Sequence, residues 1–492
     1  MKKIGTLMVL FLVLVFSCQK DLEPNEPASF PKGRITKKNQ VIPLVSSDPL
    51  KINLDKSIGY VFTLIAEVDA PVVSEQTVQA THVELAGELA LVSYNMRGAE
   101  QIGALDIIDV SDPYDPVIVK TIEFPGRDVN TVGWKDGMIV IAGQDVDGAF
   151  YGYLDPALEE PVLELHRLPS HSGISLVVQD DLTYFASGRS GGGLTIVDGE
   201  GQETFTEYPD ARSVAAGQEV YTLSKENIFV LDGSSIDIDP AFIQDFSKAE
   251  LDVSDEYLFA ALNRGGAHVY HTADLSLAQM FSRPAVPAGK EPEDYVTNSV
   301  SFNPPLFFLG NGAAGIAVSK HVDVPLEEQP PFIEYGYFDF GGPLSTNFVM
   351  SQGNFVFVAT GLGGLKILTI EEEECNWTFE TAFAGSDAGG GAAWWYYFDN
   401  TGDGTHPIYA GQQLIEGAYA QYADGVLTIV PGPNMAMQDV AEAVKIQGYN
   451  EGELPTERPA AGLFTTYKGN DLVIELDYYP YYVIHLSVMV CN

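Results

Sequence analysis

The stretch GALDIIDVSDPYDPVIVKTI (residues 103–122) contains two apolar segments separated by an acidic turn with two prolines. Val, Ile and Leu dominate both segments, which is typical of β-strands. We expect Asp109 and Asp112 to accept hydrogen bonds from backbone N–H groups at the turn, and Pro113 to fix φ there. The stretch therefore predicts two adjacent strands joined by a tight corner.

Degenerate copies of this pattern recur at intervals of roughly 40 to 48 residues, the size of a four-stranded propeller blade. Each copy has a strand, a polar turn, an apolar strand, a glycine-rich turn and another strand. Because neighbouring blades bury both faces of each sheet, strands such as FVFVAT are apolar nearly throughout. The seven copies start at His82, Asp128, Ser172, Ala211, Lys248, Thr297 and Ser345.

We therefore predict an all-β fold, with a seven-bladed β-propeller over residues 50–372. The isolated apolar strand at 56–68 is expected to complete the last blade, which lacks an obvious fourth strand of its own. The abundance of Gly (48) and Pro (29) among 492 residues suits short strands joined by turns.

The charge of the chain is strongly negative, with 26 Lys and Arg against 68 Asp and Glu and a formal net charge of -42. Proteins bind nucleic-acid phosphates through Lys and Arg, which displace counterions. We therefore expect no nucleic-acid partner. The charge favours solubility and attracts divalent cations.

The N-terminus resembles the export signal of a bacterial lipoprotein. Two Lys residues precede an apolar segment, residues 4–16, which is too short to span a membrane, and Ser17 and Cys18 follow. In such signals a small residue precedes the Cys that becomes lipidated. Residues 1–18 are thus predicted to be a lipoprotein signal peptide with lipidation at Cys18; an ordinary secreted protein with an incidental Cys is the alternative.

Residues 19–49 are rich in Pro, Lys, Glu and Ser and have no apolar period, so they are predicted to form a flexible tether. At the other end of the chain, residues 373–492 alternate aromatic strands with glycine-rich turns, which predicts a β-sandwich-like C-terminal domain. Cys375 and Cys491 bracket this domain and are the candidates for one disulfide in an oxidising compartment. Two buried free thiols are the alternative.

Two resemblances are carried by these segments. LDIIDVSDPYDPVIV, with echoes LTIVD (194–198) and IFVLD (228–232), is similar to the LVIVD repeat of bacterial β-propeller proteins. ETAF, AWWYYFD, IYAGQ and RPAAGLFTTYKG resemble a C-terminal domain of surface and secreted proteins of Bacteroidota-type bacteria, a domain of unknown function. Together they imply an LVIVD-repeat lipoprotein of the bacterial cell envelope, anchored in the outer membrane and facing either the periplasm or the exterior.

Two glycine-rich motifs match cofactor or nucleophile signatures but stand in the wrong context. GNGAAG (310–315) fits a dinucleotide fingerprint, and GRSGG (188–192) fits a nucleophile elbow. A strand follows each motif, whereas both kinds of site need a helix there. We therefore predict no organic cofactor and assign no catalytic residue.

The channel of the propeller is the first candidate binding site, since the innermost strand of each blade lines it. The polar residues that open these strands would surround the channel mouth. Only Glu250 and His82 among them offer an acid and base contrast. The channel-mouth candidates are His82, Asn130, Ser172, Arg212, Glu250, Asn298 and Asn347.

The C-terminal domain offers two further candidate sites. An aromatic run would place alternate side chains on opposite faces of a strand, where the outward ones can stack on sugars or a protein partner; core packing is the alternative. An acidic turn has a spacing that can place oxygens around calcium, although a plain hairpin turn explains it equally. The aromatic candidates are Trp394, Trp395, Tyr396 and Tyr397, and the calcium candidates are Asp399, Asn400 and Asp403.

These observations predict a non-catalytic binding or interaction module of the cell envelope. Its expected partners are the membrane, through the lipid, and a glycan or protein ligand. One alternative is a hydrolase or lyase acting on a glycan or ester at the channel mouth. Another is a structural component of the envelope.

Overall fold

The computed structural model describes residues 33–45, 58–189, 191–244, 247–322, 330–342, 344–374, 377–400, 404–432, 435–438 and 440–491. Within these ranges the chain consists almost entirely of β-strands, joined by turns and by two short 3-10 helices at Pro292–Asp294 and Ala461–Leu463. Among the same residues, no helix is long and apolar enough to cross a membrane. The all-β prediction is confirmed.

The first blade contains the stretch that predicted the fold. Its strands, from the inside outward, are β5 (Gln79–Ala86), β6 (Leu89–Asn95), β7 (Ile102–Asp109) and β8 (Val117–Pro125). At the corner between β7 and β8, the Asp109 carboxylate accepts the N–H of Ser111 at 2.9 Å, and the Asp112 carboxylate accepts the N–H of Tyr114 at 3.1 Å. The predicted corner is confirmed.

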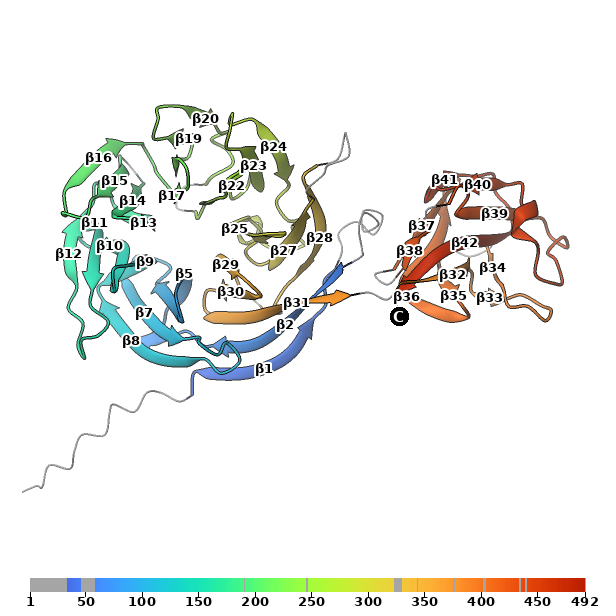
Figure 1. The fold of residues 1–492 in the computed structure, drawn as a ribbon, viewed down its shortest axis with the longest axis horizontal. Helices are drawn as coiled ribbons and strands as arrows, with labels where there is room; N and C mark the ends of the chain where they lie inside the picture. The colour runs from blue at the N-terminus through green and yellow to red at the C-terminus, as the bar shows by residue number, and fades with distance from the viewer. Residues whose placement is uncertain are drawn as a thin grey trace, which may run out of the picture.

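Five further blades repeat this order around a ring, as Figure 1 shows. Each is a four-stranded antiparallel sheet that begins with its innermost strand. The second blade contains β9 (Arg127–Lys135), β10 (Met138–Asp145), β11 (Gly148–Leu154) and β12 (Glu164–Arg167), and the third contains β13 (Ser172–Gln179), β14 (Leu182–Gly188), β15 (Gly193–Val197) and β16 (Glu203–Glu207). The fourth contains β17 (Ser213–Ala216), β18 (Val220–Leu223), β19 (Asn227–Val230) and β20 (Ser235–Asp237), and the fifth contains β21 (Glu250–Val253), β22 (Tyr257–Ala261), β23 (Ala267–His271) and β24 (Leu277–Phe281). The sixth contains β25 (Ser299–Asn303), β26 (Leu306–Gly310), β27 (Ile316–His321) and β28 (Phe332–Phe338).

The seventh blade combines both ends of the propeller. It contains β29 (Phe348–Gln352), β30 (Phe355–Ala359) and β31 (Leu365–Glu374), and β2 (Ile58–Val68) pairs antiparallel with β31. Innermost strand β29 contacts β5 of the first blade, which closes the ring of seven. The prediction that the strand at 56–68 completes the last blade is therefore confirmed.

The tether prediction for residues 19–49 is wrong in part. Ile35–Ile42 forms strand β1, which pairs with β2 and adds a fifth strand to the seventh blade. Its sequence ITKKNQVI lacks an apolar face because most of its side chains stay exposed or half-exposed in the fold. The part of the tether before residue 33 lies outside the described residues, as does Cys18. A two-stranded hairpin, β3 (Val72–Val73) with β4 (Gln76–Thr77), precedes the first blade.

Strand β1 is tied to the first blade by a buried ionic cluster, which we call the N-terminal clasp (Arg34, Tyr94, Asp106 and Thr121). The Arg34 guanidinium pairs with both carboxylate oxygens of Asp106, and it also donates to the carbonyl of Asp69. Tyr94 and Thr121 donate hydroxyl hydrogen bonds to the same carboxylate at 2.8 and 2.6 Å. Asp106 belongs to the LDIID segment and is fully buried, so its charge depends on this cluster.

The C-terminal domain is a continuous sheet of 11 strands, connected through the long last strand. That strand, β42 (Tyr481–Cys491), pairs with four others and so holds the domain together. The remaining strands are β32 (Trp377–Ala384), β33 (Asp387–Ala388), β34 (Tyr396–Asp399), β35 (Thr405–Ala410), β36 (Gln413–Ala423), β37 (Val426–Val430), β38 (Met435–Met437), β39 (Val444–Tyr449), β40 (Tyr467–Gly469) and β41 (Val473–Glu475).

Two apolar clusters pack on opposite faces of β42, because neighbouring residues of a strand point in opposite directions. Ile484, Leu486 and Val488 belong to the main core, while Val483 packs with Phe383, Trp395 and Phe464 in a smaller one. A layer therefore covers each face of the strand, in agreement with the sandwich-like prediction.

Candidate functional site

Most of the predicted channel-mouth residues hold the blades together. Asn130 donates its amide N–H to the Gly173 carbonyl of the next blade at 2.8 Å, and Asn298 and Asn347 donate in the same way to Thr346 (3.1 Å) and Ala80 (2.9 Å). Ser172 is buried and receives a second hydrogen bond from Asn130. The amides that the sequence marked as possible ligand contacts thus connect neighbouring inner strands.

Arg212 occupies the corresponding position in the fourth blade. Its guanidinium is paired with Asp210 at 2.8 Å and lies 3.4 Å from the Ser247 carbonyl of the next blade. Between other blades, hydroxyl and carboxylate oxygens accept backbone N–H groups: Leu251 donates to Ser213, and Phe302 donates to Asp252. Inter-blade hydrogen bonds of this kind stabilise the ring at the channel wall.

His82, Lys248 and Glu250 form a different arrangement, which we call the channel cluster together with Phe348. Lys248 Nζ donates to the Thr81 carbonyl at 2.7 Å and lies 3.5 Å from Glu250 Oε2. The same ammonium sits 4.5 Å from the centre of the Phe348 ring, and the His82 ring packs on that phenyl ring at 4.1 Å between centres. Lys248 thus reaches from the fifth blade to the first and seventh, bridging the channel.

The charges in the channel cluster are strongly influenced by burial. Burial lowers the pKa of His82 well below its usual value, and the Lys248 charge lowers it further. Burial also lowers the pKa of Lys248 and raises the pKa of Glu250, although each partially compensates the other. Several groups with perturbed pKa values close together are typical of functional sites, and they also occur in structural ion pairs.

Sequence reasoning missed Lys248 and also Glu84, which follows His82 by two residues on β5. Residues two apart on a strand share a face, so an alternation argument applied to His82 could have found Glu84. Lys248 lies two residues before β21, outside the strand. However, the ring geometry decides which side chains reach across the channel, and no local sequence pattern predicts this.

The pH dependence of stability gives a test of the Glu84 environment. Burial raises the pKa of Glu84 to about 7, so the folded state holds this proton more tightly than the unfolded state. The resulting cost is absent at low pH, grows as the pH rises above about 4.5 and is complete above about 7. Glu84→Gln is therefore expected to raise the free energy of unfolding by about 1–2 kcal/mol at pH 8 and not at pH 4.

Urea unfolding of both proteins at these two pH values measures the difference. Glu88→Gln, an exposed carboxylate on the adjacent turn, is the matched control and should have no comparable effect. An equal gain for Glu84→Gln at both pH values would show that burial does not govern this carboxyl group.

The predicted aromatic site divides between core and surface. Trp395 is 1% exposed and belongs to the smaller core cluster, where its indole N–H donates to the Gly390 carbonyl at 2.7 Å. Trp394, Tyr396 and Tyr397 are half-buried and pack against that cluster. Tyr396 stacks on Tyr409 at 4.1 Å between ring centres. Trp394 and the two tyrosines remain partly accessible to a partner.

The predicted calcium turn falls partly outside the described residues, which exclude Asp403. The Asn400 side chain donates to the Tyr479 carbonyl at 3.1 Å and so ties the turn to the segment just before β42. Asp399 ends β34. Within the described ranges, no group of three or more His, Cys, Asp or Glu side chains is placed to hold a metal ion. Cys491 is disulfide-bonded, whereas Cys375 lies outside the described residues, so the Cys375–Cys491 pairing stays a prediction.

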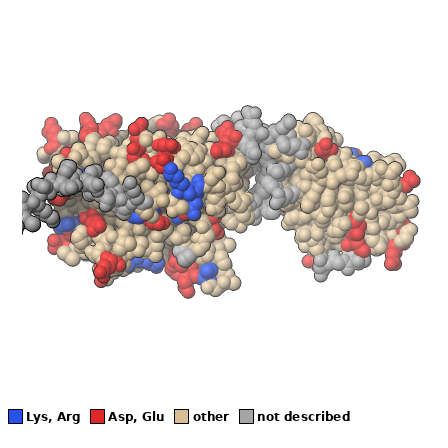
Figure 2. Space-filling view, turned by 90° about the horizontal axis from the view of Figure 1, so that it is seen from below, with Lys and Arg blue, Asp and Glu red and all other residues tan. Residues whose placement is uncertain are grey.

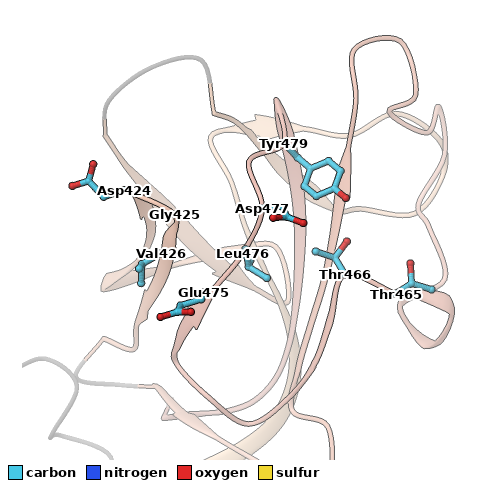
Figure 3. A pocket seen from close by; sticks show the side chains of 9 residues that line it. All are labelled: Asp424, Gly425, Val426, Thr465, Thr466, Glu475, Leu476, Asp477 and Tyr479. Atoms are coloured by element: carbon cyan, nitrogen blue, oxygen red, sulfur yellow. The ribbon is translucent and has the colours of Figure 1, made fainter.

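A groove in the C-terminal domain was not foreseen from the sequence. It has a volume of about 690 Å³, and Figure 3 shows the side chains that line it. Asp424 comes from the turn before β37, Glu475 ends β41, and Asp477 and Tyr479 lie between β41 and β42. Thr465 and Thr466, just before β40, complete the polar lining.

Hydrogen bonds beneath the groove fix its walls. The Leu476 N–H donates to the Gly425 carbonyl at 2.9 Å, and the Tyr422 hydroxyl donates to the Leu476 carbonyl at 3.0 Å. On the other side, the Thr466 hydroxyl accepts the N–H of Gly448 at 3.0 Å. The Tyr479 ring lies so close to Gly448 that a Cβ there would come within 2.2 Å of it. The absence of a side chain at residue 448 therefore positions the aromatic wall.

Acidic side chains are common on the surface beyond the groove as well. Figure 2 shows one face of the molecule, on which Asp and Glu are scattered and Lys and Arg occupy few places. This distribution agrees with the net charge of -42. The groove is thus an acidic cavity in an acidic protein, and its lining contains no Lys or Arg.

Comparisons with known proteins find similar folds but no family. No family model matches the chain, and no curated protein matches it. Among solved structures, the WD40 repeats of RRP9 have a TM-score of 0.48 and 9% identity, covering 67% of this chain and 100% of that chain. The structure of U3-55K has 0.46 and 9%, covering 61% and 98%.

A third similar structure is a catalytically inactive virginiamycin B lyase from Staphylococcus aureus with quinupristin, with a TM-score of 0.45 and 9% identity, covering 63% of this chain and 99% of that chain. All three are likenesses of fold at low sequence identity. The seven-bladed propeller itself is established by the strand pairing described above.

Proposed function

We propose that this chain is a lipid-anchored envelope protein of the LVIVD-repeat type that acts by binding a glycan. The observation that supports the proposal is the groove of the C-terminal domain, where three carboxylates, two threonine hydroxyls and one tyrosine ring line a single cavity. Carboxylates are strong acceptors for the hydroxyl groups that every sugar presents. A few convergent polar groups beside an apolar surface are typical of small-ligand sites.

The anchoring part of the proposal rests on the N-terminal sequence. Lipidation at Cys18 would leave 14 residues between the lipid and Gly33. Fully extended, such a segment reaches at most about 50 Å. The N-terminal clasp holds Arg34 against the first blade, so the propeller would stay within this distance of the membrane surface.

Binding to a glycan array by the chain lacking residues 1–18, with calcium and with chelator, tests the proposed function. For a glycan that binds, Glu475→Gln combined with Asp477→Asn is expected to weaken the affinity at least tenfold, because two acceptors facing the groove lose their charge. Glu451→Gln, an exposed carboxylate that does not line the groove, is the matched control. Binding that survives the double substitution unchanged would remove the groove from the proposal.

An enzyme acting at the channel mouth is the second candidate function, and the channel cluster is the observation that favours it. His82, Lys248 and Glu250 bring groups with perturbed pKa values together at the channel. Assays on glycan and ester substrates with Glu250→Gln and His82→Ala separate the two functions. An enzyme would lose turnover and keep substrate affinity, whereas a binding protein has no turnover to lose.

A further inference from the structure

The basic residues of the C-terminal domain are few and gathered in one place. Residues 377–491 contain 14 Asp and Glu but only three Lys and Arg, namely Lys445, Arg458 and Lys468. In so acidic a domain, we would expect the basic residues to be scattered, each beside a carboxylate that neutralises its charge. Two of these cations, Lys445 and Arg458, instead lie close enough to one histidine, His485, for their charges to lower its pKa.

Strand register places Lys445 and Lys468 in one row with His485. Phe383 on β32 pairs with His485 on β42, His485 pairs with Lys445 on β39, and Lys445 pairs with Lys468 on β40. Directly opposed residues of antiparallel strands point to the same face of the sheet. The four side chains therefore form a row across one face.

Arg458 and Trp394 adjoin the Phe383 end of this row. The guanidinium carbon of Arg458 lies 5.0 Å from the centre of the Phe383 ring and 5.7 Å from that of Trp394. The Trp394 ring meets Phe383 edge to face at 5.4 Å, and Phe383 meets His485 in the same way at 5.3 Å. We call this group, with Lys445 and Lys468, the basic aromatic patch.

Among the residues that the structure describes, the cations of this patch have no acidic partner of their own. No ion pair joins Lys445, Arg458 or Lys468 to a carboxylate within the described part of the chain, and the ammonium of Lys468 donates to the Gly462 carbonyl at 2.7 Å. Burial, together with the charges of Lys445 and Arg458, lowers the pKa of His485 to about 4. Because His485 is neutral at physiological pH, the patch carries the charges of two Lys and one Arg.

We propose that the basic aromatic patch binds a carboxylate-bearing sugar, of the uronic acid class. A guanidinium that lies over an aromatic ring keeps its N–H edge available for a bidentate pair with a planar carboxylate. The two ammonium groups supply further attraction for negative charge. The half-buried indole of Trp394 offers an apolar surface for the C–H face of a sugar ring. This site is separate from the acidic groove and does not depend on glycan binding there.

Calorimetric titration of the chain lacking residues 1–18 with trigalacturonic acid tests the proposal. Its methyl ester is the matched probe, because it keeps the sugar and removes the charge. We expect measurable binding of the acid, at least tenfold weaker binding of the ester, and weaker binding of the acid at high salt. Equal binding of acid and ester, or no binding of either, would overturn the proposal.

Three variants locate the site. Lys445→Gln and Arg458→Gln are each expected to weaken binding of the acid at least tenfold, and Arg458→Lys should not restore it because an ammonium cannot form the bidentate pair. Lys290→Gln, exposed on the propeller, is the control and should leave affinity unchanged. A sulfated trisaccharide that binds as tightly as the uronate would exclude carboxylate recognition, and Arg458→Gln with unchanged affinity would exclude this patch.

Discussion

Arg34→Met is expected to destabilise the propeller by about 3–5 kcal/mol, since it leaves the carboxylate of Asp106 buried without its cation. Asp106 has a fully buried side chain, while that of Arg34 is 15% exposed. Tyr94 and Thr121 would still donate hydrogen bonds but would not neutralise the charge. The midpoint of urea unfolding, followed by tryptophan fluorescence and by circular dichroism, measures the loss.

Two variants make this prediction specific to the N-terminal clasp. Lys37→Met removes an ion pair from the same strand, but Lys37 and Asp115 are each 58% exposed, so it should cost less than about 1 kcal/mol. Arg34→Met combined with Asp106→Leu removes both charges and should recover much of the stability. Similar losses for Lys37→Met and Arg34→Met would mean that the clasp does not depend on burial.

Lys248→Met is expected to cost about 2–3 kcal/mol, because it leaves Glu250 buried without its ammonium partner and the Thr81 carbonyl without its donor. The methionine side chain can still pack on Phe348, so the loss reports on charge rather than on volume. Thermal unfolding at pH 7 measures it.

The double variant Lys248→Met with Glu250→Gln separates the two causes. Removing the carboxylate charge as well should recover about half of the lost stability. Lys290→Met, on an exposed lysine, is the control. If the double variant is no more stable than Lys248→Met alone, the ion pair with Glu250 contributes nothing measurable and the bridge to Thr81 accounts for the effect.

The ring architecture could be predicted from the sequence because each blade is specified by short-range sequence patterns. Each blade needs its own strands and turns, so the corner at Asp109 and the apolar strands of the blades could be recognised one at a time. Strand β1 was missed because its polar sequence carries no such pattern; its place depends on pairing with β2 and on Arg34, which reaches Asp106 far along the chain.

The candidate sites were harder to predict, because their contacts also join segments that lie far apart in the sequence. Position in the repeat placed Asn130 within an innermost strand and Asn298 and Asn347 directly before one. Only their three-dimensional neighbours show that they donate to the adjacent blade. The groove draws its walls from segments around Asp424, Thr465 and Glu475, which have no common motif. Sites assembled from distant segments leave no local signal.

The seventh blade combines strands from both ends of the propeller, and this affects how the protein folds. Residue Leu64 of β2 pairs with Leu368 of β31, so these partners are separated by about 300 residues, and contacts of such long range form slowly. Synthesis delivers β1 and β2 first; these strands can pair with each other, but the other edge of β2 has no partner until β31 has emerged. We therefore expect ring closure to be the last step of propeller folding. A chain stalled before that point would expose strand edges to neighbouring chains, which is the interval in which aggregation competes with the native state.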